Sequence, residues 1–321
     1  MMKVTPFILG SGKAAQAILE ALKIIQIVHP EIQFTDAIKL KRAERFPDVS
    51  GVQNSLLLIA NPHALHASAI LEGEKAGFKF IVTEKPAATT QQDIEKLRSV
   101  KIPVAVCHGY RQMWGIQTLK DMIQKGEFGE IISLEGRYWQ SSSAQKAIAF
   151  QKTNSWKNSP ELSGNADVLL DLATHWIDAA IFLAGDEPKN ISFWKSYQNA
   201  EAPHRDTHVQ FTIEFPKTRA MASVSKTVHG SPNYFEMNVI GTKKYGAWKF
   251  IEQDILEISE GSKRSFITRD RTDIGSGHWP HHSLGWLEGY VEVIYQYLKE
   301  GSYPNLKENL DMLARFQADF T

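Results

Sequence analysis

The sequence is nearly without cysteine, since Cys107 is the only one among 321 residues. A single thiol excludes an intramolecular disulfide and any thiolate-rich zinc or iron–sulfur site, and it fits a reducing, cytoplasmic compartment. Long hydrophobic runs are also missing, because no apolar stretch reaches the roughly 18 residues of a membrane-spanning helix. We therefore expect a cytoplasmic protein with no export signal and no membrane partner.

An excess of one charge is missing too, because 36 Lys and Arg balance 36 Asp and Glu. Nucleic-acid-binding domains usually carry a strong basic excess, so we expect no nucleic-acid partner. A chain of 321 residues exceeds one ordinary domain of roughly 100 to 200 residues. All eight tryptophans lie at or after Trp114, which indicates two parts with different compositions. We predict one domain at residues 1–118 and a second at 119–321.

The first part alternates short apolar runs with helical periodicity, a pattern typical of βαβ units on a parallel sheet. Strands are expected at residues 7–9, 32–38, 55–60, 78–82 and 104–106, and helices at 14–28 and 64–76. Thr90 with Asp93 predicts a capping box that opens a further helix. The segment from Phe46 to Ser55 leaves little room for a third strand and its helix.

The second part has longer alternating strands, such as residues 208–215, which is typical of antiparallel sheet. A long helix is expected at residues 168–183 and should end at Gly185. Two more helices are expected at 284–298 and 306–316. The fold class is therefore α/β.

A glycine-rich turn lies between the first strand and the first helix, as Gly10-Ser11-Gly12-Lys13-Ala14-Ala15. It fits G-x-G-x-x-G/A, in which glycines permit a tight turn and the close approach of a pyrophosphate to the helix N-terminus. An ordinary βα turn is the alternative interpretation. Pro6, at the entry of a central strand, argues against the nucleotide interpretation.

The residue that would read the nucleotide ribose is ambiguous in the sequence. Asp36 is the nearest acid, about 24 residues after Gly12. If His29-Pro30 is taken as the turn before the second strand, Lys39 stands at this position, with Lys41 and Arg42 beside it. Cations there would suit the 2′-phosphate of NADP. The alternative is that these side chains are solvated charges.

Two further motifs carry ionisable side chains. Lys85 of Glu84-Lys85-Pro86 follows a buried strand, at the end of an α/β sheet where ligands bind. Asp171 and His175 are four apart, as on one face of a helix, and a carboxylate beside an imidazole suits a proton shuttle. The same spacing also occurs among metal ligands, and the histidines of His278-Trp279-Pro280-His281-His282 look like a metal-binding cluster. We nevertheless predict no metal.

In this order, G-x-G-x-x-A, IANPHALH, VTEKPAATT and DLATHWIDAAIFLAG resemble the Gfo/Idh/MocA family of NAD(P)-dependent oxidoreductases. The resemblance continues through Gly126-Glu127-Phe128-Gly129-Glu130-Ile131 and Gly241-Thr242. It implies an N-terminal Rossmann domain with a doubly wound parallel sheet and a C-terminal α/β domain with a large, mostly antiparallel sheet. It also implies homodimers or homotetramers formed through the open face of that large sheet.

The resemblance assigns roles residue by residue. It implies that Lys85, Asp171 and His175 are catalytic, with His175 as general base and Lys85 holding the substrate oxygen. The cofactor-binding residues would be Gly10, Ser11, Gly12, Lys13, Ala14, Asn61, His63, Glu84 and Lys85. The substrate pocket would include Tyr110, Arg111, Trp156 and His278.

The activity implied is hydride transfer between NAD or NADP, with NADP slightly favoured, and a secondary alcohol or ketone of a sugar or polyol. Two alternatives remain open at this point. One is a non-catalytic NAD(P)-sensing protein of the same fold, and the other is a glycosidase or epimerase that retains its NAD.

Overall fold

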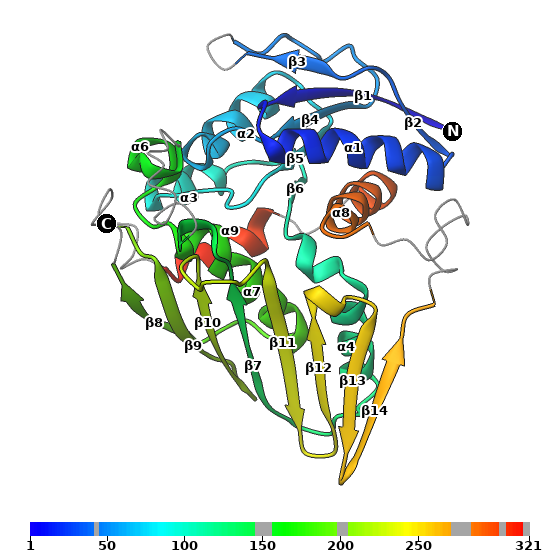
Figure 1. Cartoon of the computed structure of the whole chain (residues 1–321). Coiled ribbons are helices and arrows are strands. Elements are labelled where there is room, and N and C mark those ends of the chain that lie inside the picture. The colour runs from blue at the N-terminus through cyan, green and yellow to red at the C-terminus, as the bar shows by residue number, and fades with distance from the viewer. Residues whose placement is uncertain (42–44, 145–155, 198–204, 271–283, 302–305, 317–321) are drawn as a thin grey trace. The chain divides into compact units, whose positions relative to one another are not determined.

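A computed structural model describes residues 1–41, 45–144, 156–197, 205–270, 284–301 and 306–316. These residues form two compact units (Figure 1). Unit 1 comprises Met1–Gly109, Glu161–Gly164 and Asp270–Thr321, and unit 2 comprises Tyr110–Pro160 and Asn165–Arg269. The predicted division at residue 118 differs from this one, because the C-terminal segment belongs to unit 1. The assignment of cofactor and substrate binding to separate domains stays a prediction.

Unit 1 contains a parallel sheet of six strands, in the order β2-β1-β4-β5-β6, with β3 also paired to β1. The strands are β1 (Met2–Leu9), β2 (Ile32–Phe34), β3 (Ile38–Leu40), β4 (Ser55–Ile59), β5 (Phe80–Thr83) and β6 (Val104–Val106). The predicted strand at 32–38 is wrong in one respect, because it is two short strands with a break between them. Residues 45–54 form no helix or strand, in agreement with the prediction that this short segment leaves little room for them.

Pro6 is tolerated because of that break. Thr5 donates its backbone N–H to Asn54 O, and Leu9 O accepts from Ala60 N, so these residues of β1 bond toward β4. Pro6, with the opposite orientation, faces the side of β2 and β3. Strand β2 pairs with Met2–Val4 and strand β3 pairs with Phe7–Leu9. The gap between these two strands lies opposite Pro6, so the missing N–H of proline removes no hydrogen bond of the sheet there.

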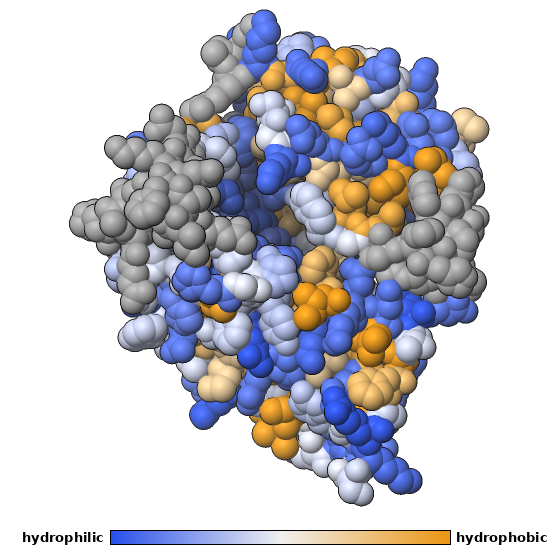
Figure 2. Space-filling view, viewed as in Figure 1, coloured by the Kyte–Doolittle hydropathy of each residue, from blue (hydrophilic) through white to orange (hydrophobic). Residues whose placement is uncertain are grey.

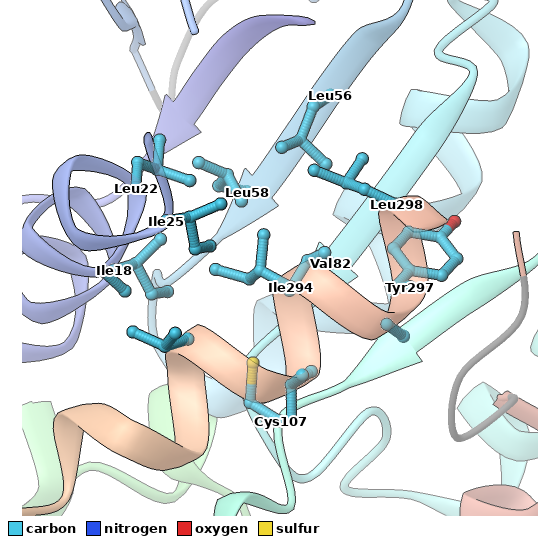
Figure 3. Close-up of a cluster of buried hydrophobic side chains, with 14 of the residues drawn as sticks. Ile18, Leu22, Ile25, Leu56, Leu58, Val82, Cys107, Ile294, Tyr297 and Leu298 are labelled. Carbon is cyan, nitrogen blue, oxygen red and sulfur yellow. The ribbon is translucent and has the colours of Figure 1, made fainter. Parts of the chain in front are cut away.

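Helices cover both faces of the unit 1 sheet. They are α1 (Lys13–Val28), α2 (His66–Lys75), α3 (Gln91–Leu97), α8 (Leu287–Glu300) and α9 (Leu306–Ala314), with a 3₁₀ turn at His63–Leu65. On one face, α1 and α8 enclose a buried apolar cluster with β4 and β5 (Figure 3). Ile18, Ile25, Leu58 and Ile294 in this cluster are at most 1% exposed.

The other face of this sheet carries α2. A Cβ on Gly73 of α2 would lie 2.5 Å from Leu57 Cδ2 and 3.0 Å from Ile81 Cδ1, so a glycine lets the helix approach the sheet closely. The helix α3 begins as predicted, because Thr90 Oγ1 accepts a hydrogen bond from Asp93 N at 3.1 Å. Helices on both faces give the doubly wound arrangement.

Unit 2 contains an eight-stranded sheet in the order β14-β13-β12-β11-β7-β10-β9-β8, in which only β7 and β10 pair in parallel. Its strands are β7 (Ile131–Trp139), β8 (Asn190–Ser196), β9 (His208–Glu214), β10 (Arg219–Ser225), β11 (Tyr234–Gly241), β12 (Tyr245–Lys249), β13 (Ile255–Glu260) and β14 (Lys263–Thr268). The alternation predicted for β9 is confirmed, because Val209, Phe211 and Ile213 are buried and Gln210 and Thr212 are exposed.

Helices α4 (Trp114–Gln124) and α7 (Thr174–Ala184) pack on one face of this sheet. Shorter turns are 3₁₀ segments at Gly109–Gln112, Trp156–Asn158 and Phe250–Glu252 and the helix α6 (Pro160–Ser163). The helix predicted at 168–183 begins as a π-helix at Leu169–Ala173, continues as α7, and ends at Gly185 with φ 70°. Trp176 Nε1 of α7 donates to Glu236 O at 3.0 Å.

The two C-terminal motifs of the family resemblance contact each other. Thr242 N donates to Glu130 O at 2.9 Å, and Lys243 N donates to Phe128 O at 3.0 Å. A Cβ on Gly129 would lie 2.3 Å from Thr242 Oγ1, and Gly129 has φ +71°. The glycines are therefore needed where this loop meets the turn between β11 and β12.

Hydrophobic residues on the visible surface form small groups among hydrophilic ones (Figure 2). None of the helices in the part of the chain that the structure describes combines the length and the apolar character needed to cross a bilayer.

Candidate functional site

The turn between β1 and α1 has the backbone geometry of a phosphate-binding loop. Gly10 has φ +135°, and a Cβ there would lie 2.3 Å from Ala60 O, so only glycine lets the ends of β1 and β4 come this close. Gly12 is the N-cap of α1, and no atom lies within 4 Å of the position of its missing Cβ. The first turn of α1 has no acidic residue and no side-chain cap.

Ser11 and Lys13 are exposed in this turn, and Ala14 is half-buried. No side chain caps the first N–H groups of the 16-residue helix α1, so they can receive a phosphate. Asn61, after β4, adds a second indication of a ligand, because its buried Oδ1 accepts no hydrogen bond from any residue in the described ranges. A ribose hydroxyl is a donor of the kind that this oxygen needs. The residues present therefore fit a dinucleotide.

The segment after β5 buries two ionisable side chains. Glu84 and Lys85 are 8% and 6% exposed. Tyr290 of α8 donates a short hydrogen bond to Glu84 Oε1, and Lys85 N donates to Glu84 Oε2 at 3.2 Å. Helix α8 thus fixes the carboxylate beside Lys85, a contact that the sequence did not indicate.

His66 connects this segment to the one after β4. Its Nδ1 lies 2.8 Å from Pro86 O and its Nε2 lies 2.8 Å from Asn61 O. His63, predicted to bind the cofactor, is buried, and its ring makes an edge contact with the ring of His66. Burial lowers the pKa of His66 by more than the two carbonyl contacts raise it. Unit 1 therefore brings Gly10, Asn61 and Lys85 to linked segments at the carboxyl ends of adjacent strands.

In unit 2, Asp171 lies on the π-helix, a structure that often occurs at functional sites. Its Oδ2 lies 2.6 Å from Lys157 Nζ and 2.7 Å from Lys226 Nζ. Lys226 Nζ also contacts Asp167 Oδ1 at 2.5 Å. Burial alone would lower the pKa of Lys226, but Asp171 and Asp167 outweigh it and raise that pKa.

His175 follows Asp171 by one turn and lies among aromatic rings. Its ring centroid is 5.3 Å from that of Tyr110 and 6.3 Å from that of Tyr138, in edge-on contacts. Tyr110 also stacks on Phe235 at 4.1 Å. Burial raises the pKa of Tyr110 to about 12, so its hydroxyl stays protonated at neutral pH. The structure thus brings Tyr110 and His175 together.

The remaining predicted pocket residues have different surroundings. Arg111 is buried and makes a two-point ion pair with Asp178, with Nε to Oδ2 at 3.0 Å. This pair gives Arg111 a structural role, and its contact with substrate stays a prediction. Trp156 is half-buried, next to Lys157, whose Nζ lies 5.8 Å from the Trp156 ring centroid. His278 lies outside the described residues.

Within the described residues, no group of three or more His, Cys, Asp or Glu side chains could hold a metal ion. Sequence reasoning missed several polar residues of unit 2, namely Tyr138, Gln140, Lys157, Lys226 and Asn233. The available signal for Lys226 was its position directly after the buried end of β10. Tyr138 lies on the covered face of β7, where alternation would predict an apolar residue.

Comparisons with known proteins agree with this architecture. Residues 116–245 match the model of the GFO/IDH/MocA C-terminal domain. Levoglucosan dehydrogenase from Pseudarthrobacter phenanthrenivorans is 28% identical over 270 residues, 74% of this chain and 67% of that protein. D-xylose dehydrogenase from Paenarthrobacter nicotinovorans is 28% identical over 150 residues, 44% of this chain and 37% of that protein.

A solved structure of levoglucosan dehydrogenase in complex with NADH and L-sorbose has a TM-score of 0.83 to this one at 19% identity. The superposition covers 99% of this chain and 96% of that chain. The predicted fold, a doubly wound parallel sheet with a large, mostly antiparallel sheet, is confirmed. Residues 116–245 thus resemble the GFO/IDH/MocA C-terminal domain, and the whole chain shares the fold of levoglucosan dehydrogenase.

Proposed function

We propose that the protein is a nicotinamide-dependent dehydrogenase that oxidises a secondary alcohol of a sugar or polyol, or reduces the matching ketone. The observation that carries this proposal is the polar centre of unit 2. There His175 lies against two tyrosine rings, one turn after an aspartate held by two lysines. The relatives support the substrate class, because they are dehydrogenases of levoglucosan and D-xylose.

The chemistry at this centre follows from the ionisable groups. The glycine-rich turn after β1 and Asn61 would hold NAD or NADP, which would supply the acceptor for the hydride of the alcohol. His175 takes the hydroxyl proton as general base, and in the reverse direction returns it as general acid. Lys85 of unit 1, which the family resemblance marks as catalytic, would stabilise negative charge on the substrate. Asp171, fixed by Lys157 and Lys226, orients the substrate or the imidazole.

The choice of cofactor depends on the edge of the unit 1 sheet. Leu40 of β3 pairs with Leu9, directly before Gly10, and Lys41 follows it. Asp36 lies between β2 and β3, before that edge. Exposed Lys39 and Lys41 would favour the 2′-phosphate of NADP, whereas a levoglucosan dehydrogenase structure contains NADH. We propose that NAD is accepted and that these lysines also admit NADP.

A substrate panel tests the proposal. Levoglucosan, D-xylose, other sugars and polyols are supplied with NAD or NADP, and reduced cofactor is followed by absorbance. NADH and NADPH are titrated separately by fluorescence. We expect turnover with at least one sugar. Cofactor binding without any turnover would instead support the non-catalytic sensor. Co-purifying NAD with sugar conversion but no net reduction would support the NAD-retaining enzyme.

We further propose a homodimer or homotetramer through the open face of the large sheet. Met221, Thr212, Asn238 and Phe266 share this face, because the strand registers place them in one row. Exposed apolar side chains there include Trp194 at 58%, Phe266 at 56% and Met221 at 49%. Apolar exposure of this kind on a sheet marks an interaction surface.

A further inference from the structure

Four polar side chains in unit 2 form a connected hydrogen-bond network beside His175. Tyr110 and Tyr138 contact each other through their hydroxyls at 3.1 Å. Gln140 Nε2 lies 3.1 Å from the Tyr138 hydroxyl and 2.8 Å from Asn233 Oδ1. Asn233 Nδ2 lies 2.8 Å from the Tyr110 hydroxyl. The four contacts close a ring.

The amide orientations in this ring follow from counting hydrogens. With the Gln140 and Asn233 nitrogens placed as above, each of the four contacts contains one hydrogen. If both amides are turned over, Tyr138 donates to Gln140 and Tyr110 donates to Asn233. The two tyrosine oxygens would then face each other without a hydrogen between them. The first orientation is therefore the satisfied one.

This orientation leaves one donor over. Tyr110 accepts from Asn233 and donates to Tyr138, which accepts from both Tyr110 and Gln140. The hydrogen of the Tyr138 hydroxyl then has no acceptor among the residues that the structure describes. A buried donor is normally satisfied, and Tyr138 is only 5% exposed.

We propose that the Tyr138 hydroxyl donates a hydrogen bond to an oxygen of the bound sugar and thereby selects substrates that carry an oxygen at that position. The inference rests on the proposed function. The tyrosine ring lies against His175, so this oxygen belongs to the part of the sugar near the reacting carbon. A site built to bond an oxygen rejects the analogue that lacks it, because a buried donor is then left unpaired.

The donor is present at neutral pH. Burial, together with Tyr110 and Asp171, raises the pKa of Tyr138 well above its usual value, so the phenol stays protonated. Its ring packs edge-on against Tyr110 and Phe235, which holds the hydroxyl in place. The network therefore presents a rigid neutral donor, which suits a hydroxyl or ether oxygen.

Tyr138→Phe is the direct test, since it removes the hydroxyl and keeps the packing of the ring. We expect kcat/KM for the preferred sugar to fall roughly tenfold, the factor that a lost neutral hydrogen bond gives. NADH affinity should be unchanged. Tyr245→Phe is the matched control. Tyr245 donates to Asn238 at 2.9 Å on the open face of the same sheet, so its loss should leave kcat/KM unchanged.

Monodeoxy analogues of that sugar separate binding from a structural effect. With the analogue that lacks the bonded oxygen, wild type and Tyr138→Phe should have equal kcat/KM, whereas other analogues keep the tenfold ratio. The same ratio with every analogue would overturn the proposal, as would an unchanged kcat/KM for the full sugar. A crystal structure of wild type with cofactor and sugar gives a check independent of the variant. There the Tyr138 oxygen should lie within about 3.2 Å of a sugar oxygen. Absence of turnover by wild type with any sugar would overturn the proposed function together with this inference.

Discussion

Lys226, whose side chain is 6% exposed, compensates the partly buried carboxylates of Asp171 and Asp167. Replacing Lys226 by Met leaves both carboxylates with weaker compensation, and breaking a buried ion pair in this way costs about 3–5 kcal/mol. We expect the free energy of unfolding, measured in urea, to fall by that amount. Lys157→Met is the control. It contacts the same Asp171 from a side chain that is 39% exposed, so we expect a loss below about 1 kcal/mol. Equal losses would contradict the prediction.

Lys85 and His175 should matter for turnover far more than for cofactor binding. Replacing Lys85 by alanine removes a group that stabilises charge in the transition state, and replacing His175 removes the group that accepts the proton. In both variants kcat should fall by about 10²–10⁴-fold. Fluorescence titration should give an NADH affinity close to that of wild type. The exposed Lys96→Ala in α3 serves as the control. Near-normal kcat in both variants would remove their catalytic assignment.

His66 should make stability depend on pH. Burial lowers its pKa in the folded protein from the ordinary value of 6.5, so below that pH the unfolded chain binds a proton that the folded protein resists. The free energy of unfolding should therefore fall as pH is lowered from 7 to 5. In His66→Gln this contribution is lost, and the decline with acid should be shallower. Parallel pH curves for the two proteins would refute the prediction.

At the scale of elements, α8 approaches the end of β6 through two glycines. A Cβ on Gly289 would lie 2.7 Å from Gly109 Cα. The atoms nearest to it all belong to the backbone of Gly109, which cannot move aside as a side chain could. Gly289→Ala should lower the free energy of unfolding by about 1–3 kcal/mol, despite the better helix propensity of alanine. At Gly51 a Cβ meets nothing within 4 Å, so Gly51→Ala should be neutral. Thermal unfolding compares the two, and a neutral Gly289→Ala would show that α8 can move outward.

The elements also show where sequence reasoning reached its limit. Continuous apolar runs such as Leu56–Ile59 predicted buried strands because both faces of a parallel sheet are covered. The break between β2 and β3 was missed because residues 32–38 carry no strong turn signal. Periodicity predicted α8 as a helix, but it identifies an apolar face and not the element that covers it. The assignment of α8 to unit 1 therefore required coordinates.

The candidate site divides in the same way. Motif spacing predicted Gly10, Lys85 and His175 as site residues, because their backbone or charge requirements are local. Lys226 and Tyr138 act through contacts with residues distant in the sequence, Asp167 and Asn233 among them. A lysine at a strand end is usually an exposed charge, and a tyrosine on a strand is usually core. Neither residue type alone could reveal its partner.

At the scale of the whole molecule, the open sheet face predicts association between copies of the chain. We expect light scattering to give a multiple of the 36.2 kDa chain mass. Met221→Glu places a charge among the apolar side chains of that face and should shift the protein toward monomer. Ile27→Glu, at a 39% exposed position of α1, is the control and should leave the mass unchanged. A monomeric wild type would contradict the prediction.

The contribution of α8 to unit 1 has a consequence for how the chain matures. Ile294 of α8 lies in the core with Ile18 and Ile25 of α1 and Leu58 of β4, yet it is synthesised long after them (Figure 3). Once β14 has been translated, the sheet of unit 2 has all its strands, whereas the apolar side of α1 still lacks α8. Order of appearance in the chain is thus the reverse of order of completion, and nascent unit 1 is the part that we expect to need protection by chaperones.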